Sequence, residues 1–276
     1  MNRTVYLIEN KHLQATVEGP SILITKPGHA PQRIPIRFIN KIYIIGKVNI
    51  RSDVIYKLSI NNIPLILAER SGSERAVILP FNHKLPKFYR EQKIILENQQ
   101  NIKRYTNWID AYRSYFQHQL IKRFLPKLRQ KNGVGEGDYK ILLKQLWPKN
   151  NLLVLPVKKT VTHLMRGLLI EKINKIGLDV HTGAYFRRLN FGFALDMGYL
   201  LEPKVDEQVI LFFKKKNFYR FFVKTPHKYS NPNKFKLTKE GYRNIIHRFE
   251  NLKDLLENQI DLILDDFFHL LRELKA

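Results

Sequence analysis

The stretch GLDVHTGAYFRRLNFGFALDMGYLLEPKVDEQV, residues 177–209, is the most informative part of the chain. It opens with a glycine that can end the helical pattern before it, because glycine readily adopts the left-handed conformation of a helix C-cap. Arg187 and Arg188 precede Asp196, which lies between apolar residues. Such an aspartate can serve as a helix-cap or turn residue, or it can bind a metal ion as one of several ligands. The rest of the sequence has to distinguish these two roles.

The N-terminal part of the chain has the pattern of β-strands. Short runs rich in Ile, Val, Tyr and Leu, several of them alternating, predict strands: RTVYLIE, HLQATVE, SILITK, QRIPI, KIYIIG, IPLILAE and RAVILP. One short helix fits after Ser52-Asp53, since Val54, Ile55 and Leu58 fall on one face. Residues 81–88, FNHKLPKF, have the composition of a linker.

Beyond the linker the apolar spacing becomes helical. The first long helix is predicted from the following apolar residues: Leu96, Trp108, Ile109, Tyr112, Phe116, Leu120 and Phe124. Further helices are predicted at 139–147, at 162–177 with Gly177 as C-cap, and within 205–216 and 238–272. We therefore predict an α+β protein of two domains. A β-rich domain spans 1–80, a linker 81–88, and a larger all-α domain 89–276.

The chain is strongly basic, with 48 Lys and Arg against 24 Asp and Glu and a net charge of +24. An excess of this size predicts a polyanionic partner, most often nucleic acid. A membrane surface, an acidic protein or a generally basic proteome are the alternatives. The absence of Cys excludes disulfides and thiolate metal sites. No apolar run reaches the ~18–20 residues of a membrane helix, and MNRTVYLIEN lacks a signal-peptide core, which predicts a cytoplasmic protein.

The basic residues gather in clusters that could contact DNA phosphates. The residues predicted to do so are Arg123, Lys127, Lys158, Lys159, Arg166, Arg187, Arg188, Lys214, Lys215, Lys216 and Arg220. Those after residue 213 are interleaved with Phe218, Tyr219 and Phe221, which could stack on frayed bases. Any single cluster could instead be a solvated face. The expected binding is dominated by the DNA backbone and is therefore sensitive to salt.

The C-terminal segment has the opposite charge. Residues 250–276 carry seven acids and three bases, a net charge of −4. Glu257, Asp261 and Asp265 recur every four residues, so they could contact a basic partner or pair with the protein's own basic face. We favour a solvated helix whose apolar residues face a core or a dimer partner.

The order of domains and the opening stretch resemble the CRISPR-associated integrase family, CRISPR-associated protein one. Matches to the family pattern in this stretch are Gly177, Leu178, Asp179, Gly183, Leu195, Asp196, Met197, Pro203, Val205, Asp206 and Val209. Arg90 and Gln92 after the linker, and Glu136-Gly137, are weaker matches. The resemblance implies a homodimer formed through the β domains, a small ferredoxin-like partner subunit, and divalent-metal-dependent joining of DNA 3′-hydroxyl ends to repeat DNA.

The sequence departs from the family at the implied metal ligands, which are a Glu, a His and a later acid. Glu136 matches the first, but the His position falls on Phe186 and the later acid on Tyr199. The resemblance therefore leaves Glu136 and Asp196 as candidate catalytic and Mg²⁺- or Mn²⁺-binding residues, with His181 as a possible further ligand. Two carboxylates alone would make a weak Mg²⁺ site.

Three functional interpretations follow. The first is a spacer-acquisition integrase and endonuclease subunit. The second is a catalytically degenerate subunit with the same fold, which scaffolds DNA or an active partner. The third is a basic two-domain nucleic-acid-binding protein outside this family. The first two differ in the chemistry expected at Phe186 and Tyr199.

Overall fold

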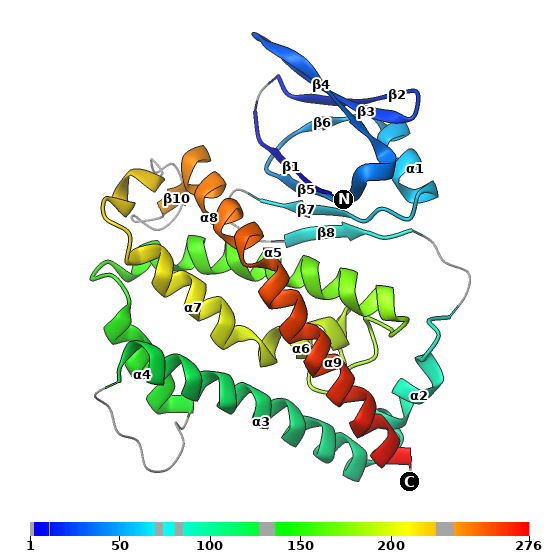
Figure 1. Ribbon diagram of the computed structural model, residues 1–276, viewed down its shortest axis with the longest axis vertical. Helices are drawn as coiled ribbons and strands as arrows, with labels where there is room; N and C mark the ends of the chain where they lie inside the picture. Colours follow the sequence, from blue (N-terminus) through cyan, green and yellow to red (C-terminus); the bar gives the residue numbers. More distant parts are fainter. Residues whose placement is uncertain are drawn as a thin grey trace. The chain divides into compact units, whose positions relative to one another are not determined.

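The computed structural model describes residues 3–10, 12–69, 74–80, 85–126, 136–224 and 235–275 (Figure 1). The chain divides into two compact units, Met1–His83 and Lys84–Ala276. Strands dominate the first unit and helices the second, which confirms the predicted α+β class. None of the described helices is both long and apolar enough to cross a membrane.

The N-terminal unit consists of two four-stranded sheets and one helix. One sheet has the order β1-β5-β7-β8 and the other β4-β3-β2-β6. The elements are β1 (Arg3–Ile8), β2 (Gln14–Glu18), β3 (Ser21–Lys26), β4 (His29–Pro35), β5 (Ile39–Ile45), β6 (Asn49–Ile50), α1 (Ser52–Ile60), β7 (Leu65–Ala68) and β8 (Glu74–Ile78). In the first sheet β1, β5 and β7 are parallel, and only β8 is antiparallel to its neighbour. β5 is almost entirely buried, as expected for a central parallel strand.

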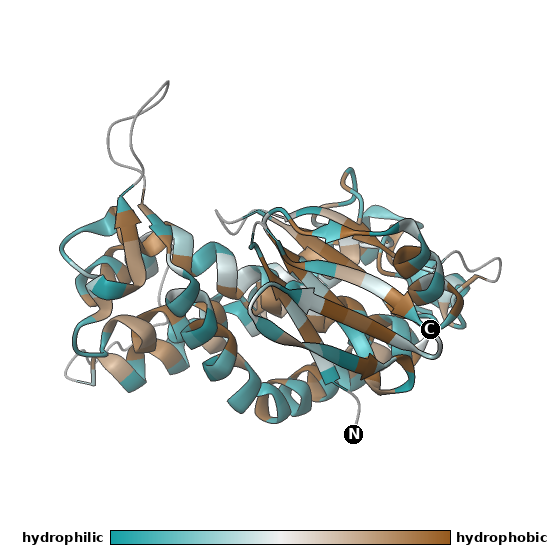
Figure 2. Ribbon diagram, turned by 90° about the horizontal axis from the view of Figure 1, so that it is seen from above, coloured by the Kyte–Doolittle hydropathy of each residue, from teal (hydrophilic) through white to brown (hydrophobic). Residues whose placement is uncertain are grey.

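One apolar core is shared by both sheets and α1. It includes Leu7 of β1, Ile22 of β3 and Ile42 of β5, each almost fully buried. Val54 and Leu58 of α1 join this core, which confirms the predicted apolar face of the short helix. Figure 2 shows the corresponding hydrophobic colouring along the strands. The alternation read from the sequence thus places one face of each sheet inward.

The C-terminal unit is a bundle of helices with one small hairpin. Its elements are α2 (Tyr89–Lys93), α3 (Gln99–Phe124), α4 (Glu136–Leu146), α5 (Val154–Ile176), α6 (Gly192–Leu200), α7 (Glu202–Phe213), β9 (Phe222–Lys224), β10 (Phe235–Leu237), α8 (Lys239–Asn251) and α9 (Lys253–Lys275). α5 packs against α6, α7, α8 and α9. It is buried on nearly every side, which fits a helix that is apolar all round.

The structure extends the sequence-based description at three places. α5 starts at Val154, eight residues before the predicted start, and contains Pro156 in its first turn, where proline is tolerated. α6 lies inside the opening stretch, where no helix was predicted. α7 ends at Phe213, so Lys214–Lys216 follow the helix rather than belonging to it. Gly177 caps α5 with a φ of 84°, as predicted.

Candidate DNA-binding site

Asp196 lies within α6 and its side chain is completely buried. Its Oδ2 accepts hydrogen bonds from the Tyr105 hydroxyl at 2.8 Å and from the amides of Ala184 and Tyr185 at 2.9 and 3.2 Å. Its Oδ1 accepts from the Phe186 amide at 2.8 Å. These bonds fix the backbone of residues 184–186, which immediately precede Arg187 and Arg188. We call residues 178–191, which link α5 to α6, the arginine loop.

The surroundings of Asp196 suit an anchor for this loop. Burial raises the pKa of Asp196, and the four donated hydrogen bonds act in the opposite direction. Burial together with the nearby carboxylate raises the pKa of Tyr105, so its hydroxyl stays protonated and keeps donating. Both carboxylate oxygens are therefore occupied by protein donors. This geometry favours the interpretation of Asp196 as a structural residue over that of a metal ligand.

A close backbone approach explains Gly183 of the arginine loop and Gly192, the first residue of α6. A Cβ on Gly183 would lie 2.6 Å from the amide nitrogen of Phe193 and would also strike Asp196 Oδ2. A Cβ on Gly192 would lie 2.8 Å from the carbonyl oxygen of His181. The loop therefore rests directly on the first turn of α6, and side chains are excluded from the contact.

Gln92 of α2 holds the other end of the loop. Its Nε2 donates to the carbonyls of Asp179 and Thr182, and its Oε1 accepts from the Asp179 amide, all at 2.8 Å. Gln92 is completely buried. The His181 ring also serves the loop, since its Nδ1 accepts from the Phe191 amide at 3.1 Å. The observed contact of the His181 ring is thus with the backbone of the same loop. Its role as a metal ligand remains a prediction.

Phe186 and Tyr199, the positions aligned with family metal ligands, line one cavity of about 280 Å³. Most of its wall is apolar, including Met165, Leu189 and Val205. Among the described residues, no group of three or more His, Cys, Asp or Glu is arranged to hold a metal ion. Mg²⁺ and Mn²⁺ require several oxygen or imidazole ligands. The residues present in the described structure do not fit such an ion.

Next to this cavity lies a cluster of paired charges. Lys158 Nζ lies 2.7 Å from Glu202 Oε1 and 2.8 Å from Asp206 Oδ1. Arg113 lies 2.6 Å from Glu202 Oε2, donates to the Tyr199 carbonyl, and stacks 3.9 Å above the Tyr199 ring. Two cations thus neutralise two carboxylates, and the cluster joins α3, α5 and α7.

The pKa shifts in this cluster follow from the pairing. Burial opposes the charge of Lys158, but attraction to Asp206 and Glu202 outweighs it and raises the pKa of Lys158. Burial alone would raise the pKa of Glu202, but Lys158 and Arg113 outweigh it and lower that pKa. Both groups are therefore charged at neutral pH.

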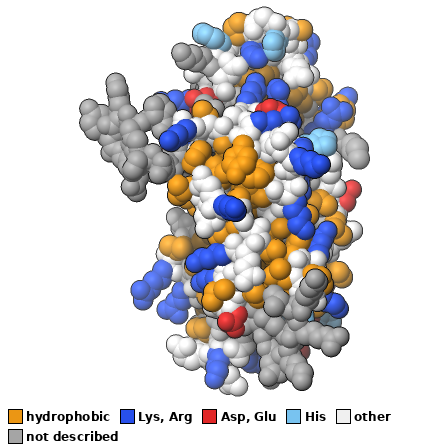
Figure 3. Space-filling view, turned by 90° about the vertical axis from the view of Figure 1, so that its left-hand side faces the viewer, with side chains coloured by type: hydrophobic (Ala, Val, Ile, Leu, Met, Phe, Trp, Pro, Cys, Tyr) orange, Lys and Arg blue, Asp and Glu red, His pale blue; other side chains and the backbone are white. Residues whose placement is uncertain are grey.

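Several predicted DNA contacts lie on exposed surface. Arg187 and Arg188 of the arginine loop are exposed. Lys214, Lys215 and Lys216 are exposed beyond α7, beside the stacked pair Phe218 and Tyr219 with ring centres 4.2 Å apart. On the face shown in Figure 3, Lys and Arg side chains are widespread and acidic ones few. The surface available for phosphate contact is thus distributed over several elements.

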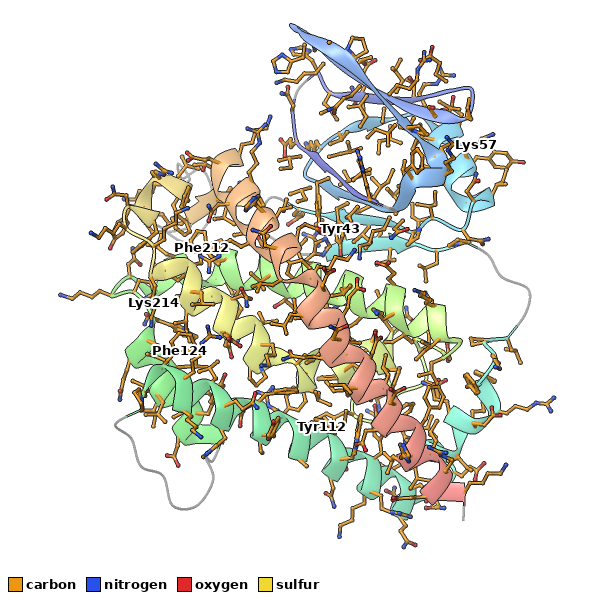
Figure 4. The ribbon with its side chains drawn as sticks, viewed as in Figure 1. Tyr43, Lys57, Tyr112, Phe124, Phe212 and Lys214 are labelled. Carbon is orange, nitrogen blue, oxygen red and sulfur yellow. The ribbon has the colours of Figure 1, made fainter. Side chains whose placement is uncertain are left out.

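The structure brings together two basic clusters that are far apart in the sequence. Lys214 Nζ lies 4.5 Å from the ring centre of Phe124, the last residue of α3 (Figure 4). Arg123 therefore lies near the start of the lysine run, and it forms an ion pair with Glu207. The Arg123 side chain is 58% exposed, whereas that of Glu207 is 12% exposed.

The fold of this chain is shared with known proteins. A CAS1 protein from Thermotoga maritima has a similar structure over 99% of this chain and 97% of its own, with a TM-score of 0.75 and 17% sequence identity. Residues 6–136 match the family model described as CRISPR associated protein Cas1. The predicted resemblance to the Cas1 family is confirmed.

Two further solved structures share the Cas1 fold. A casposase bound to its integration product matches with a TM-score of 0.71 and 17% identity, over 91% of this chain and 82% of its own. A Cas6-RT-Cas1–Cas2 complex matches with a TM-score of 0.72 and 12% identity, over 94% of this chain and 34% of its own. At these identities the likeness establishes the fold. None of the curated proteins matches the sequence.

The remaining predicted contacts of this Cas1-like chain differ in their surroundings. The Lys158 ammonium is paired with Glu202 and Asp206, which disfavours its contact with phosphate. Arg220 pairs with Glu240 at 3.0 Å. Lys159 and Arg166 are half-buried on α5. Lys127 lies outside the described residues. Glu136 begins α4, but its side chain is not among those that the structure describes.

Three residues that build the site are not predicted by the sequence pattern. Tyr105 and Arg113 lie on the buried side of α3, four residues before and four residues after Ile109, respectively. A base and a phenol at apolar-face positions of a helix are a signal that could have been recognised. Tyr139 of α4 donates to Asp206 Oδ2 at 3.0 Å. Its position in an ordinary amphipathic pattern carried no such signal.

The acidic repeat of the C-terminal helix is partly explained. Lys172 of α5 lies 2.8 Å from Asp261 and 3.3 Å from Glu257. These two acids therefore pair with the protein's own base, which was one of the two alternatives. Asp265, the third member, is exposed.

Proposed function

We propose that this chain acts in spacer acquisition as an integrase-fold subunit that binds DNA through phosphate contacts. The observation that supports this most directly is the Cas1 fold over almost the whole chain, combined with an exposed arginine pair on a loop held by a buried aspartate. A rigidly held base loses less conformational entropy on binding phosphate than a free one. The loop therefore serves as a preorganised anion contact.

The expected DNA surface extends from the arginine loop to the lysines after α7. Lys and Arg contacts to phosphate position the duplex without reading its sequence. Tyr219, whose side chain is 61% exposed, is available for stacking on an unpaired base. A homodimer through the β-rich unit and a ferredoxin-like Cas2-type partner belong to the same proposal. The Cas1–Cas2 complex among the similar structures supports such a partner.

We further propose that the chain holds DNA without joining it. Strand transfer in the family implies a divalent ion, whereas Phe186 and Tyr199 supply no ligand of the required kind and Asp196 is used by four protein donors. An active integrase that uses Glu136 is the second candidate. It is favoured by the family resemblance and by the position of Glu136 at the start of α4.

DNA binding is tested by measuring the affinity for a short labelled duplex over a range of salt concentrations. Each phosphate contact contributes about 0.9 to the slope of log K against log salt, so Arg187→Ala/Arg188→Ala should lower the slope by about 2. Arg33→Ala/Arg75→Ala, two exposed arginines of the N-terminal unit, is the matched control. An affinity that does not fall with salt would refute DNA binding through phosphates.

The reaction is tested with labelled duplex bearing 3′-hydroxyl ends, a supercoiled repeat-bearing plasmid, and Mg²⁺ or Mn²⁺. We expect salt-sensitive binding and no joined product. Joined product that is lost in Glu136→Gln but retained in Glu97→Gln, an exposed control, would establish the active integrase instead. Asp196→Ala is unsuitable here because it would also release the arginine loop.

A further inference from the structure

A groove between α3 and α9 is distinct from the arginine loop and the charge cluster. It has a volume of about 540 Å³. Its walls include Tyr112, Tyr115 and Phe116 of α3 and Leu262 and Ile263 of α9, and the other lining residues are Ala and Gln. Tyr112 is labelled on α3 in Figure 4. None of the described residues that line the groove is charged, in a chain of which 26% is charged.

The groove exposes large apolar side chains to solvent. Leu262 is 70% exposed and Tyr115 is 56% exposed. Leu255, two helical turns before Leu262 on the same face of α9, is 57% exposed. An aromatic and aliphatic patch of this kind, depleted of charge, has the composition of the centre of a protein interface.

The α9 side of the groove carries two aspartates. Asp265 and Asp266 follow Leu262 by three and four residues, and therefore lie beside it on α9. Asp266 Oδ2 accepts from Trp108 Nε1 at 2.8 Å and from the Tyr112 hydroxyl at 3.1 Å. Burial and the bond to Asp266 raise the pKa of Tyr112 to about 12, so this donor is uncharged at neutral pH. In the part of the chain that the structure describes, neither aspartate forms an ion pair.

This local charge argues against nucleic acid at the groove. The chain as a whole has a net charge of +24, yet residues 250–276 carry −4. A polyanion would be repelled by Asp265 and Asp266, whereas a cationic protein segment would be attracted. An apolar strip between two helices also matches the way amphipathic helices bind in grooves.

We propose that the α3–α9 groove binds an amphipathic helical segment of a protein partner, with apolar residues facing the groove and Lys or Arg at its flanks. The apolar face would cover Leu262 and Tyr115, and the flanking bases would pair with Asp265 and Asp266. This proposal concerns a second surface and does not depend on DNA binding or on DNA joining.

The test uses two fluorescent helical peptides with identical Leu and Phe anchors at i, i+3 and i+7, flanked either by Lys or by Glu. Binding to the full chain is followed by fluorescence anisotropy. The Lys-flanked peptide should bind at least about 10-fold more tightly than the Glu-flanked one, and Leu262→Arg should weaken it about 10-fold or more. Ile141→Arg, an equally accessible apolar position on α4, should change the affinity less than about twofold.

A second variant, Tyr115→Ser, should also weaken binding of the Lys-flanked peptide, and its thermal melt shows whether the fold persists. Equal binding of the two peptides, or no effect of Leu262→Arg and Tyr115→Ser, would overturn the proposal. Concentration-dependent dimerisation abolished by Leu262→Arg would replace the partner by a second copy of this chain. Loss of duplex affinity in Leu262→Arg would assign the groove to DNA.

Discussion

The helical unit contains two buried aspartates on neighbouring helices that are satisfied in different ways. Asp196 on α6 accepts only from neutral donors, namely three backbone amides and a tyrosine hydroxyl. Asp206 on α7 contacts the Lys158 ammonium at 2.8 Å as well as the Tyr139 hydroxyl. Asp196 thus holds a loop whose two arginines are exposed, whereas Asp206 forms an ion pair with Lys158 inside the protein.

The difference separates basic residues that are available to an external anion from those that are held by internal carboxylates. A lysine with two internal carboxylate partners must break both pairs before it can contact phosphate. An arginine on an anchored, exposed loop has no such cost. Net charge and sequence position cannot distinguish these cases, but the carboxylates around each base can.

The largest effect is expected from Lys158→Met, which leaves Glu202 and Asp206 with an uncompensated charge. Removing one partner of a buried pair costs about 3–5 kcal/mol of unfolding free energy. Lys175→Met, an exposed lysine at the end of the same helix, should cost less than about 1 kcal/mol. Urea denaturation measures the unfolding free energy of both variants. An equal loss in the two would show that the ion pairs of Lys158 stabilise the fold no more than an exposed lysine does.

Asp196→Asn should have the next largest effect, because the introduced NH₂ group faces amide donors. Leaving buried donors without an acceptor costs about 2–3 kcal/mol. The arginine loop should loosen as well, which hydrogen exchange at the amides of residues 184–186 would detect. A variant with unchanged exchange at these amides would contradict the assigned role of Asp196 as anchor.

Glu202 and Asp196 should respond to acid in opposite directions, whereas burial raises the pKa of Asp206 as it does that of Asp196. The lowered pKa of Glu202 adds stability above its ordinary value of 4.5, and this stability is lost as pH falls. The raised pKa of Lys158 adds stability below its ordinary value of 10.5, and this stability is lost as pH rises further. The stability gap between wild type and Lys158→Met should therefore be widest between these values and narrow on either side.

At Asp196 the folded state binds a proton more readily than the unfolded state, because its pKa is raised. Its ionisation therefore costs stability as pH rises through the folded pKa, and acid relieves that cost. Unfolding free energies of wild type, Lys158→Met and Asp196→Asn across pH would reveal both trends. If the unfolding free energies of the two variants changed with pH in the same way relative to wild type, the predicted difference between Glu202 and Asp196 would be wrong.

The smallest effect is expected from Tyr105→Phe, which removes one of four donors to Asp196 and leaves the amides in place. The cost should be about 1–2 kcal/mol, since one hydrogen bond to a charged group is lost. Duplex affinity should be nearly unchanged, because the backbone bonds to residues 184–186 remain. A large loss of affinity would show that the phenol, rather than the amides, holds the loop.

Patterns local in sequence were sufficient for much of the fold. The apolar face of α1 and the C-cap at Gly177 were predicted because both depend on neighbouring residues. α6 was missed because its first residues are ordered by contacts with the arginine loop. Phe191, just before it, adopts a left-handed φ of 62°, which no local preference predicts.

The site was less accessible to sequence reasoning than the fold. The exposure of Arg187 and Arg188 followed from their type. Asp196 was predicted to be either a cap or turn residue or a metal ligand, whereas in the structure it lies in the middle of α6 and binds the amides of residues 184–186. The pairing of Lys158 with Glu202 and Asp206 joins residues 44 and 48 positions apart, and a basic cluster alone gave no sign of it. Metal binding by Glu136, Asp196 and His181 stays a prediction.

Hydrogen bonds connect Phe88 and Gln92, at α2, to the segment that starts at Gly177. The Phe88 amide donates to the Gly177 carbonyl at 2.9 Å, and Gln92 binds the loop through three further bonds. These residues follow directly after the boundary between the two units. A displacement of Phe88 and Gln92 would therefore be transmitted through these four hydrogen bonds to Gly177 and the arginine loop.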